Sequence, residues 1–301
     1  MSYAFVFICQ PGHLEIKTIL LTISLKYFLK CDHELIVVIP RPASVWGEPD
    51  KLTLDVLDKL GVRIFEINNE ISSPRHPGGG YVNKTFCFQT VRTNKDKIIF
   101  LDSDMLCLRD FFDNHDLSAA FNARLAASST EGRWEDIFKK TNIPMPEIKH
   151  PATFSGESIP PYFNSGFICV AKEMAFRLGS EWLRSYKILR ATDIMADNMA
   201  FEEQVALTLA LVKLKLKYNT VTEKYNYPLS LRKKISKDQV PYFCHYHAPE
   251  TLKHSLFILT LIKSFMHQYP ESKLILKRQR GFWKDVVNNG PMFIKLKYSL
   301  V

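Results

Sequence analysis

Short apolar runs alternate with longer segments of helical periodicity along the first part of the chain. The runs at 3–9 and 34–39 are almost continuously apolar, which is typical of strands buried on both faces of a sheet, and residues 62–67 are expected to form a third strand. Between them, apolar residues recur at helical spacing over 14–30 and 50–60. Because predicted strands and helices alternate along the chain, the pattern predicts an α/β fold with a mostly parallel central sheet flanked by helices.

A fourth apolar run, residues 97–101, leads directly into Asp102, Ser103 and Asp104. Ligands of open α/β sheets bind at the carboxyl ends of the strands, so both carboxylates are expected at such a site. Two hard oxygen ligands suit Mg²⁺ or Mn²⁺ that substrate phosphates also hold. The alternative for a bare Asp-x-Asp pair is a solvated turn.

The pattern is less regular after this run. Further elements expected are helices over 83–92, 174–189, 200–211 and 252–266 and strands over 167–170 and 241–247. Residues 72–80, with three glycines and two prolines, predict a flexible loop. Residues 142–161 hold five prolines and little periodicity, so we expect an ordered but irregular insertion there.

The composition is that of a globular protein with a large core. Apolar residues make up 46% of the chain and charged residues 24%, so global disorder is not expected. The formal net charge of +9 favours anionic partners: a nucleotide, a phosphate-bearing acceptor or an anionic membrane surface. We expect no nucleic-acid partner, because the sequence has no helix-turn-helix, zinc-finger or aromatic RNA-binding signature.

Two features point to the cytoplasm. The six cysteines are scattered, with no Cys-x-x-Cys pair, and predict buried free thiols rather than a zinc site. The apolar run at the N-terminus lacks a basic start and predicts a strand rather than a signal peptide. No apolar stretch is long enough for a transmembrane helix.

The C-terminal region leaves two interpretations open. The apolar segment 252–266 is followed by a stretch, 273–301, that mixes lysines and arginines with aromatic residues. Such a region can dock peripherally on a membrane or an anionic acceptor. It can equally be a helix packed on the core with a solvated tail.

Polar motifs follow the predicted elements in a fixed order. They are Lys84, Asp102-Ser103-Asp104, Asn164-Ser165-Gly166, Glu203-Gln204 and His245-Tyr246-His247. Over roughly residues 3–250 this set resembles the retaining glycosyltransferases of family 8, the group that includes glycogenin and bacterial lipopolysaccharide galactosyltransferases.

The resemblance implies a GT-A fold, in which a Rossmann-like sheet binds a UDP-sugar through Mn²⁺ or Mg²⁺. It places a catalytic domain in 1–250, with a nucleotide-binding half in 1–105 and a sugar and acceptor half in 106–250. Residues 251–301 are then a helical, basic C-terminal extension.

The resemblance also implies a metal site. Asp104 would bind the metal directly, and Asp102 would bind it together with the ribose side of the donor. The third ligand would be His245, with His247 as the second choice. The family carries a lysine six residues after its histidine, and Lys253 holds that position when counted from His247, so we expect Lys253 to reach the phosphates.

Further donor contacts implied by the resemblance are Lys84, Asn164, Ser165 and Gly166. The catalytic pair would be Glu203 and Gln204, where the family has Asp-Gln. The carboxylate would hold sugar hydroxyls. The Gln204 amide would lie near the anomeric carbon, on the face opposite the leaving group.

The sequence therefore predicts a metal-dependent retaining glycosyltransferase that moves a hexose from a UDP-sugar to a glycan or glycoconjugate acceptor. One alternative is a sugar-nucleotide nucleotidyltransferase, which would carry a glycine-rich basic signature where this chain has residues 10–13. Another is a non-catalytic glycan- or membrane-binding protein with a degenerate transferase fold. The presence of Asp102, Asp104 and Gln204 argues against it.

Overall fold

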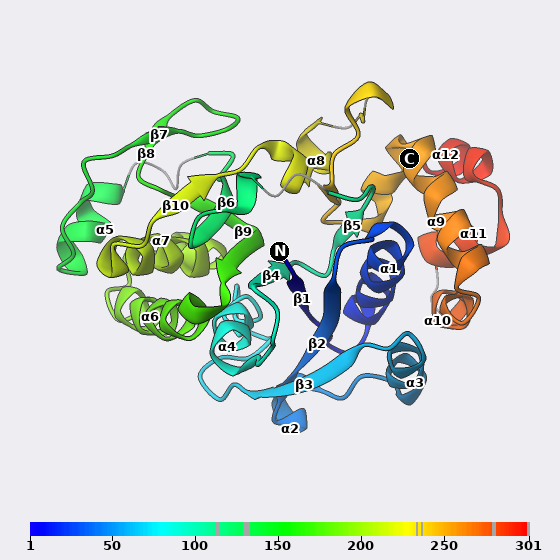
Figure 1. Ribbon diagram of the computed structural model, residues 1–301, viewed down its shortest axis with the longest axis horizontal. Helices are drawn as coiled ribbons and strands as arrows, with labels where there is room; N and C mark the ends of the chain where they lie inside the picture. The colour runs from blue at the N-terminus through cyan, green and yellow to red at the C-terminus, as the bar shows by residue number, and fades with distance from the viewer. Residues whose placement is uncertain (112–114, 129–132, 233, 236, 279–280, 300–301) are drawn as a thin grey trace.

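A seven-stranded sheet forms the centre of the computed structural model (Figure 1). Its strand order is β10-β6-β9-β4-β1-β2-β3. The strands are β1 (Tyr3–Ile8), β2 (His33–Arg41), β3 (Arg63–Asn68), β4 (Lys97–Leu101), β6 (Phe121–Leu125), β9 (Phe163–Ala171) and β10 (Tyr218–Thr220). Neighbours are parallel except at β9, which is antiparallel to both β4 and β6. The predicted mostly parallel sheet is thus confirmed.

The structure describes residues 1–111, 115–128, 133–232, 234–235, 237–278 and 281–299. Within these ranges, β11 (Tyr227–Pro228), β12 (Phe243–His245) and β5 (Met105–Cys107) form a second sheet, and β7 (His150–Pro151) pairs with β8 (Ser158–Ile159). The short helices are α2 (Ala43–Trp46), α5 (Trp134–Lys140), α8 (Leu229–Arg232) and the 3₁₀ turns η1 (His115–Leu117), η2 (Ala196–Phe201), η3 (Glu223–Tyr225), η4 (Lys237–Gln239) and η5 (Pro249–His254).

Helices cover both faces of the central sheet. One face carries α1 (His13–Phe28), α3 (Lys51–Lys59), α9 (Leu256–Gln268), α10 (Ser272–Arg278) and α11 (Phe282–Asn288). The other carries α4 (Asn83–Thr90), α6 (Lys172–Arg190) and α7 (Glu202–Leu214). Because successive strand residues point to opposite faces, Phe5 and Phe7 enter the first core while Ala4 and Val6 enter the second.

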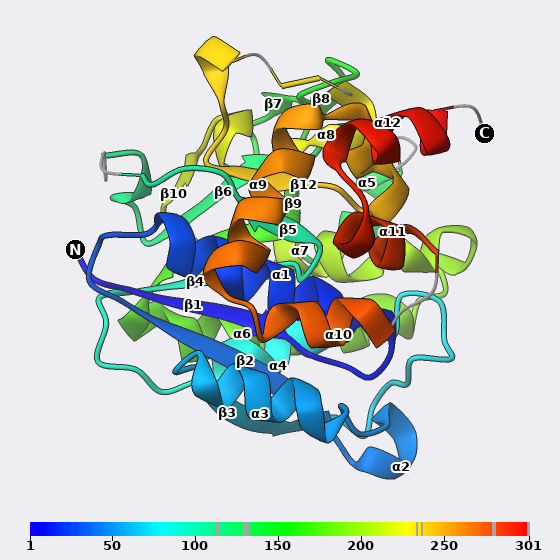
Figure 2. The ribbon, with the colours of Figure 1, turned by 90° about the vertical axis from the view of Figure 1, so that its right-hand side faces the viewer.

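The C-terminal helices share a core with the N-terminal half. Figure 2 shows α9 and α10 in front of α1, and both contact it. Phe265 of α9 and Trp283 of α11 are buried in the same cluster as Phe5 of β1. The final helix, α12 (Pro291–Ser299), packs on α9 and η5. Arg280, one of the basic residues in the C-terminal stretch, lies outside the described residues.

Three element boundaries differ from those the sequence predicts. The expected helix over 252–266 is divided into η5 and α9, because the Ser255 hydroxyl accepts a bond from the backbone N–H of Ile258 and starts a new helix. The strand expected at 167–170 begins earlier, at Phe163, and the strand expected at 241–247 ends at His245. Between 142 and 161 the two-residue strands β7 and β8 are the regular structure in an otherwise irregular segment.

All six cysteines are free, and five of them are buried, as predicted. Among the described residues, no helix combines the length and the apolar character that a membrane span needs.

Candidate active site

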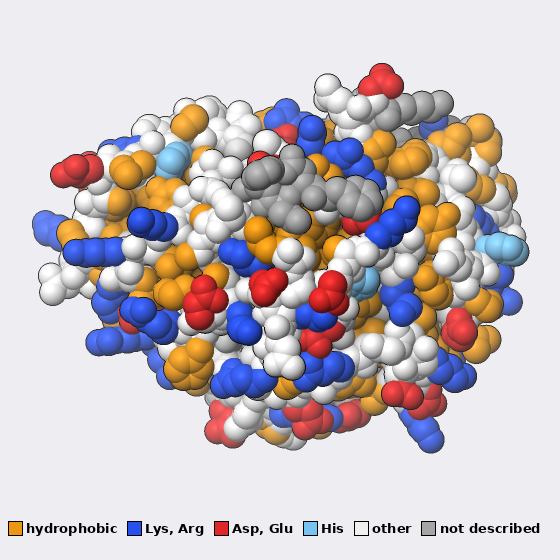
Figure 3. Space-filling model, viewed as in Figure 1, with side chains coloured by type: hydrophobic (Ala, Val, Ile, Leu, Met, Phe, Trp, Pro, Cys, Tyr) orange, Lys and Arg blue, Asp and Glu red, His pale blue; other side chains and the backbone are white. Residues whose placement is uncertain are grey.

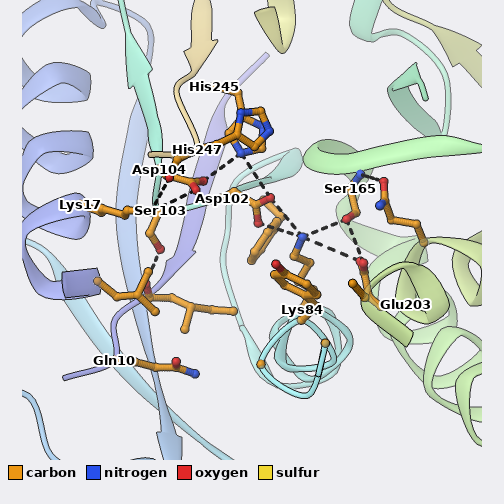
Figure 4. A pocket seen from close by; sticks show the side chains of 18 of the residues that line it. Gln10, Lys17, Lys84, Asp102, Ser103, Asp104, Ser165, Glu203, His245 and His247 are labelled. Atoms are coloured by element: carbon orange, nitrogen blue, oxygen red, sulfur yellow. Dashed lines mark hydrogen bonds and ion pairs between the residues drawn. The ribbon is translucent and has the colours of Figure 1, made fainter. Parts of the chain in front are cut away.

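A cavity of about 550 Å³ opens at the carboxyl ends of the parallel strands. Its lining comes from segments that are far apart in the sequence: the β1–α1 connection, the loop 74–81, α4, the loop after β4, the start of β9, the start of α7 and the end of β12. Figure 4 shows the polar side chains of these segments turned toward one another.

Backbone pairing holds the segments in register. The N–H of Asp102 donates to the carbonyl of Gly166 over 2.8 Å, which joins the loop after β4 to the start of β9. Because β9 is antiparallel, its first residues lie at the edge where the parallel strands end. On the other side of the loop, His245 of β12 lies opposite Met105 of β5.

Asp102, Asp104 and His245 converge at one point. One potential ligand atom from each lies within 4.8 Å of the others. The His245 Nε2 is 2.9 Å from Asp104 Oδ1 and 3.9 Å from Asp102 Oδ2. Two carboxylates and an imidazole are a donor set that Mn²⁺ and similar divalent ions accept. The sequence-predicted residues therefore fit a metal ion.

Polar contacts on the far side of the ring orient His245. Its Nδ1 lies 3.2 Å from Oδ1 of the buried Asn226, whose amide donates to Asn164 Oδ1 over 2.6 Å. When a metal ion displaces the proton from Nε2, an imidazole that donates its Nδ1–H to Asn226 is the tautomer whose Nε2 can bind that ion. A Cβ at Gly166 would lie 2.9 Å from His245 Cε1 and Nδ1, so the ring needs a glycine at this position.

A second cluster lies on the other side of Asp102. The Lys84 ammonium is 2.8 Å from Asp102 Oδ1 and 3.9 Å from Glu203 Oε1, and it donates to Ser165 Oγ over 2.9 Å. The Ser165 hydroxyl in turn donates to Glu203 Oε2 over 3.1 Å. Lys84, Ser165 and Glu203 are all buried.

Charge and burial shift the protonation of this cluster. Burial opposes the charge on Lys84, but Asp102 and Glu203 outweigh it and raise the pKa of the ammonium above its usual range. Burial raises the pKa of Glu203 to about 7, although Lys84 and the Ser165 hydroxyl act in the opposite direction. Glu203 is thus a carboxyl that can gain or lose a proton near neutral pH.

The remaining predicted residues have different positions. Gln204 lines the cavity, and its Oε1 accepts a bond from the Ser165 N–H over 3.3 Å. The His247 ring stacks on His245 at 3.9 Å, and its Nδ1 lies 3.2 Å from Ser230 Oγ. Lys253 lies in η5, half-buried, and is not among the described residues that line the cavity.

Two residues of the site were missed by the sequence analysis. Lys17 of α1 is buried, and its ammonium is 3.3 Å from Asp104 Oδ2 and 2.8 Å from the carbonyl oxygen of His247. The sequence feature that could have identified Lys17 is the presence of a lysine within an otherwise apolar helical segment. Burial opposes ionisation of Asp104, but His245 and Lys17 hold the pKa of its carboxyl well below the usual range. Asn226, a single residue in a turn, gave no signal.

Comparison with known proteins identifies the family. No curated protein matches the chain. A family model described as the Rhodobacterales glycosyltransferase domain matches residues 5–215, which is more than two-thirds of the chain. The matched range includes Lys84, the Asp102–Asp104 loop, Asn164 to Gly166 and Gln204, and it ends before His245. The fold is accordingly GT-A-like, and the protein belongs to the Rhodobacterales glycosyltransferase domain family.

Proposed function

We propose that this glycosyltransferase is of the family 8 type: metal-dependent, retaining, and specific for a UDP-hexose that it transfers to a glycan or glycoconjugate acceptor. The observation that carries the proposal is the convergence of Asp102, Asp104 and His245 beside the buried Lys84–Ser165–Glu203 cluster. The first group suits a cation on a diphosphate. The second provides fixed polar atoms for a sugar.

In this proposal Asp102, Asp104 and His245 hold Mn²⁺ or Mg²⁺, with His247 as the second choice for the third ligand. When bound, the ion neutralises charge on the diphosphate leaving group. Asn226 keeps the His245 ring in place from behind.

The sugar would lie against α7 and the start of β9. Glu203 Oε1 has no hydrogen-bond partner among the described residues and suits a sugar hydroxyl. Asn164 and Gln204 line the same part of the cavity. Gln204 is a poor nucleophile, so we infer a front-face reaction through an oxocarbenium-like state that retains the anomeric configuration.

Nucleotide-sugar binding and turnover test the proposal. A panel of UDP- and GDP-sugars is screened for thermal stabilisation with and without Mn²⁺, since a bound ligand stabilises the folded state by mass action. We expect Mn²⁺-dependent stabilisation by a UDP-hexose, UDP release with acceptor, and a product with the donor's anomeric configuration by NMR. Pyrophosphate release from UTP and a sugar phosphate would instead favour the nucleotidyltransferase. Binding without either reaction would favour a degenerate transferase.

We further propose that the C-terminal helices bind an anionic membrane surface from the cytoplasmic side. Residues 251–301 contain nine basic and two acidic residues, so this sixth of the chain carries seven of the nine net positive charges. In α12, Met292 and Phe293 are exposed beside Lys295. Basic and hydrophobic side chains share the right-hand edge of Figure 3, where Figure 1 places these helices.

Vesicle co-sedimentation tests the membrane proposal. Each basic residue near an anionic surface contributes about 1 kcal/mol to binding. We expect binding to vesicles of 30% anionic lipid, loss of binding in neutral vesicles, and weaker binding of Lys295→Glu. Equal sedimentation with both vesicle types would contradict the proposal. The cytoplasmic location is consistent with six free thiols, which a reducing compartment preserves.

A further inference from the structure

Lys17 places a buried ammonium at the edge of the cavity. It lies in the second turn of α1, and its side chain is 8% exposed. Figure 4 shows the side chain reaching from α1 toward Asp104. Among the described residues that line the cavity, Lys17 and Lys84 are the two lysines, and no arginine is present.

The two lysines occupy different electrostatic positions. Lys84 contacts two carboxylates, those of Asp102 and Glu203, and the Ser165 hydroxyl, on the proposed sugar side of Asp102. Lys17 has one carboxylate oxygen, Asp104 Oδ2, and one backbone carbonyl oxygen, that of His247. The ammonium also lies over the Tyr246 ring, 5.8 Å from its centroid. Because an ammonium group has three N–H donors, the two oxygen partners leave one donor that can turn to an oxygen of a ligand.

Among the described residues after His247, no lysine lines this cavity. Lys253, the expected phosphate contact, does not line it. Thr251, the residue six positions after His245, uses its hydroxyl to donate to the carbonyl oxygens of Tyr246 and Ala248. A diphosphate held near Asp104 therefore has Lys17 as the nearby lysine.

We propose that Lys17 binds the diphosphate of the nucleotide donor, in the role that the sequence assigned to Lys253. This inference rests on the proposed function. In the nucleotide-free protein, Lys17 balances the charge of Asp104. A divalent ion bound to that carboxylate would neutralise part of its charge and weaken its hold on Lys17, so the ammonium could turn toward phosphate oxygens, which bind a point charge well.

The proposal makes two predictions of opposite direction for Lys17→Met. Calorimetric titration with UDP in the presence of Mn²⁺ should show about 10- to 100-fold weaker binding, while uridine, which has no phosphate, should bind unchanged in competition experiments. Titration with Mn²⁺ alone should show equal or tighter binding, because Asp104 loses a competing cation. Lys17→Arg should recover part of the UDP affinity.

Lys97→Met is a matched control. Lys97 is as buried as Lys17, and its ammonium also donates to a backbone carbonyl oxygen, that of Ala119 at 2.7 Å, but it does not line the cavity. We expect wild-type binding of UDP and Mn²⁺ by this variant. If Lys17→Met does not fold, Lys17→Gln replaces it, because the amide can still donate to the His247 carbonyl.

Several outcomes would overturn the assignment. UDP affinity within twofold of wild type in Lys17→Met would do so, as would a loss confined to Lys253→Met. A parallel loss of UDP and Mn²⁺ binding in Lys17→Met would assign Lys17 a structural role instead. If the wild type binds none of UDP, GDP, ADP and CDP, whether or not Mn²⁺ is present, the proposed function fails and the Lys17 assignment fails with it.

Discussion

The two sides of the cavity differ in the burial of their side chains and in how those side chains are paired. On the side proposed to hold the sugar (the sugar side), Lys84, Ser165 and Glu203 are buried and bonded to one another, so the cluster resembles a small polar core. On the side proposed to hold the metal (the metal side), the Asp104 carboxylate is 20% exposed and is shared by His245 and Lys17. We therefore expect the first side to act as a fixed scaffold and the groups of the second to exchange partners when a ligand binds.

The largest effect is expected from breaking the scaffold. Lys84→Met leaves Asp102 and Glu203 without their ammonium, and removal of one partner from a buried ion pair costs about 3–5 kcal/mol. Denaturant unfolding without ligands measures this change. On the metal side, Lys17→Met should cost less, since the one carboxylate that loses its ammonium, that of Asp104, stays paired with His245. Equal losses in the two variants would remove the proposed difference between the sides.

The next effect concerns ligand binding rather than stability. Asp104→Asn keeps the shape of the side chain but removes its charge, and it should weaken Mn²⁺-dependent UDP binding at least 100-fold with a smaller loss of stability than Lys84→Met. His245→Ala should behave similarly. His247→Ala should show a milder loss of about 10-fold, as is typical of residues behind a ligand. Calorimetry with and without Mn²⁺ distinguishes them. Undiminished Mn²⁺ dependence in Asp104→Asn would refute the metal site.

The sugar side should also make stability depend on pH. The pKa of Glu203 is raised to about 7 in the folded protein from an ordinary value near 4.5. The folded state therefore binds this proton more tightly, and the contribution of Glu203 to the free energy of unfolding falls as pH rises from about 4.5 to about 7. In the wild type, this residue should lower the free energy of unfolding by roughly 1–3 kcal/mol between pH 5 and pH 8. Glu203→Gln should abolish that decrease, which denaturant unfolding at the two pH values measures.

The exposed Glu173 is the control for this experiment. Glu173→Gln should keep the pH dependence of the wild type. If Glu203→Gln keeps it as well, the carboxyl of Glu203 titrates outside this range.

The smallest effect tests the contact between the two sides. Gly166 belongs to β9, and an added Cβ would press on the His245 ring at 2.9 Å. Gly166→Ala should displace the ring and weaken Mn²⁺ binding about 10-fold. Gly290→Ala, where a Cβ meets nothing within 4 Å, should leave Mn²⁺ binding unchanged. Unchanged binding in both variants would show that the ring has room to move.

The sequence was most informative where one physical requirement controls many residues. Burial on both faces requires apolar runs, so β1, β2, β4 and the carboxylates after β4 were predictable. Strand direction leaves no such mark, and the antiparallel course of β9 could not be predicted. Lys17 and Asn226 were missed because a single polar residue, without a partner at fixed spacing, is recognised only when the fold brings its contacts together.

The pairing of β4 with β9 has a consequence for folding. The two strands are more than sixty residues apart in sequence, and closing so long a loop is slow compared with the formation of local contacts. Asp102 pairs with Gly166 only after this closure, so a ribosome-bound chain that ends before β9 has its acidic loop but lacks one wall of the cavity that we propose binds the nucleotide. Capture of nucleotide during refolding would therefore report the completion of the sheet. A one-residue slip of β9 would turn Ser165 to the opposite face and abolish that signal.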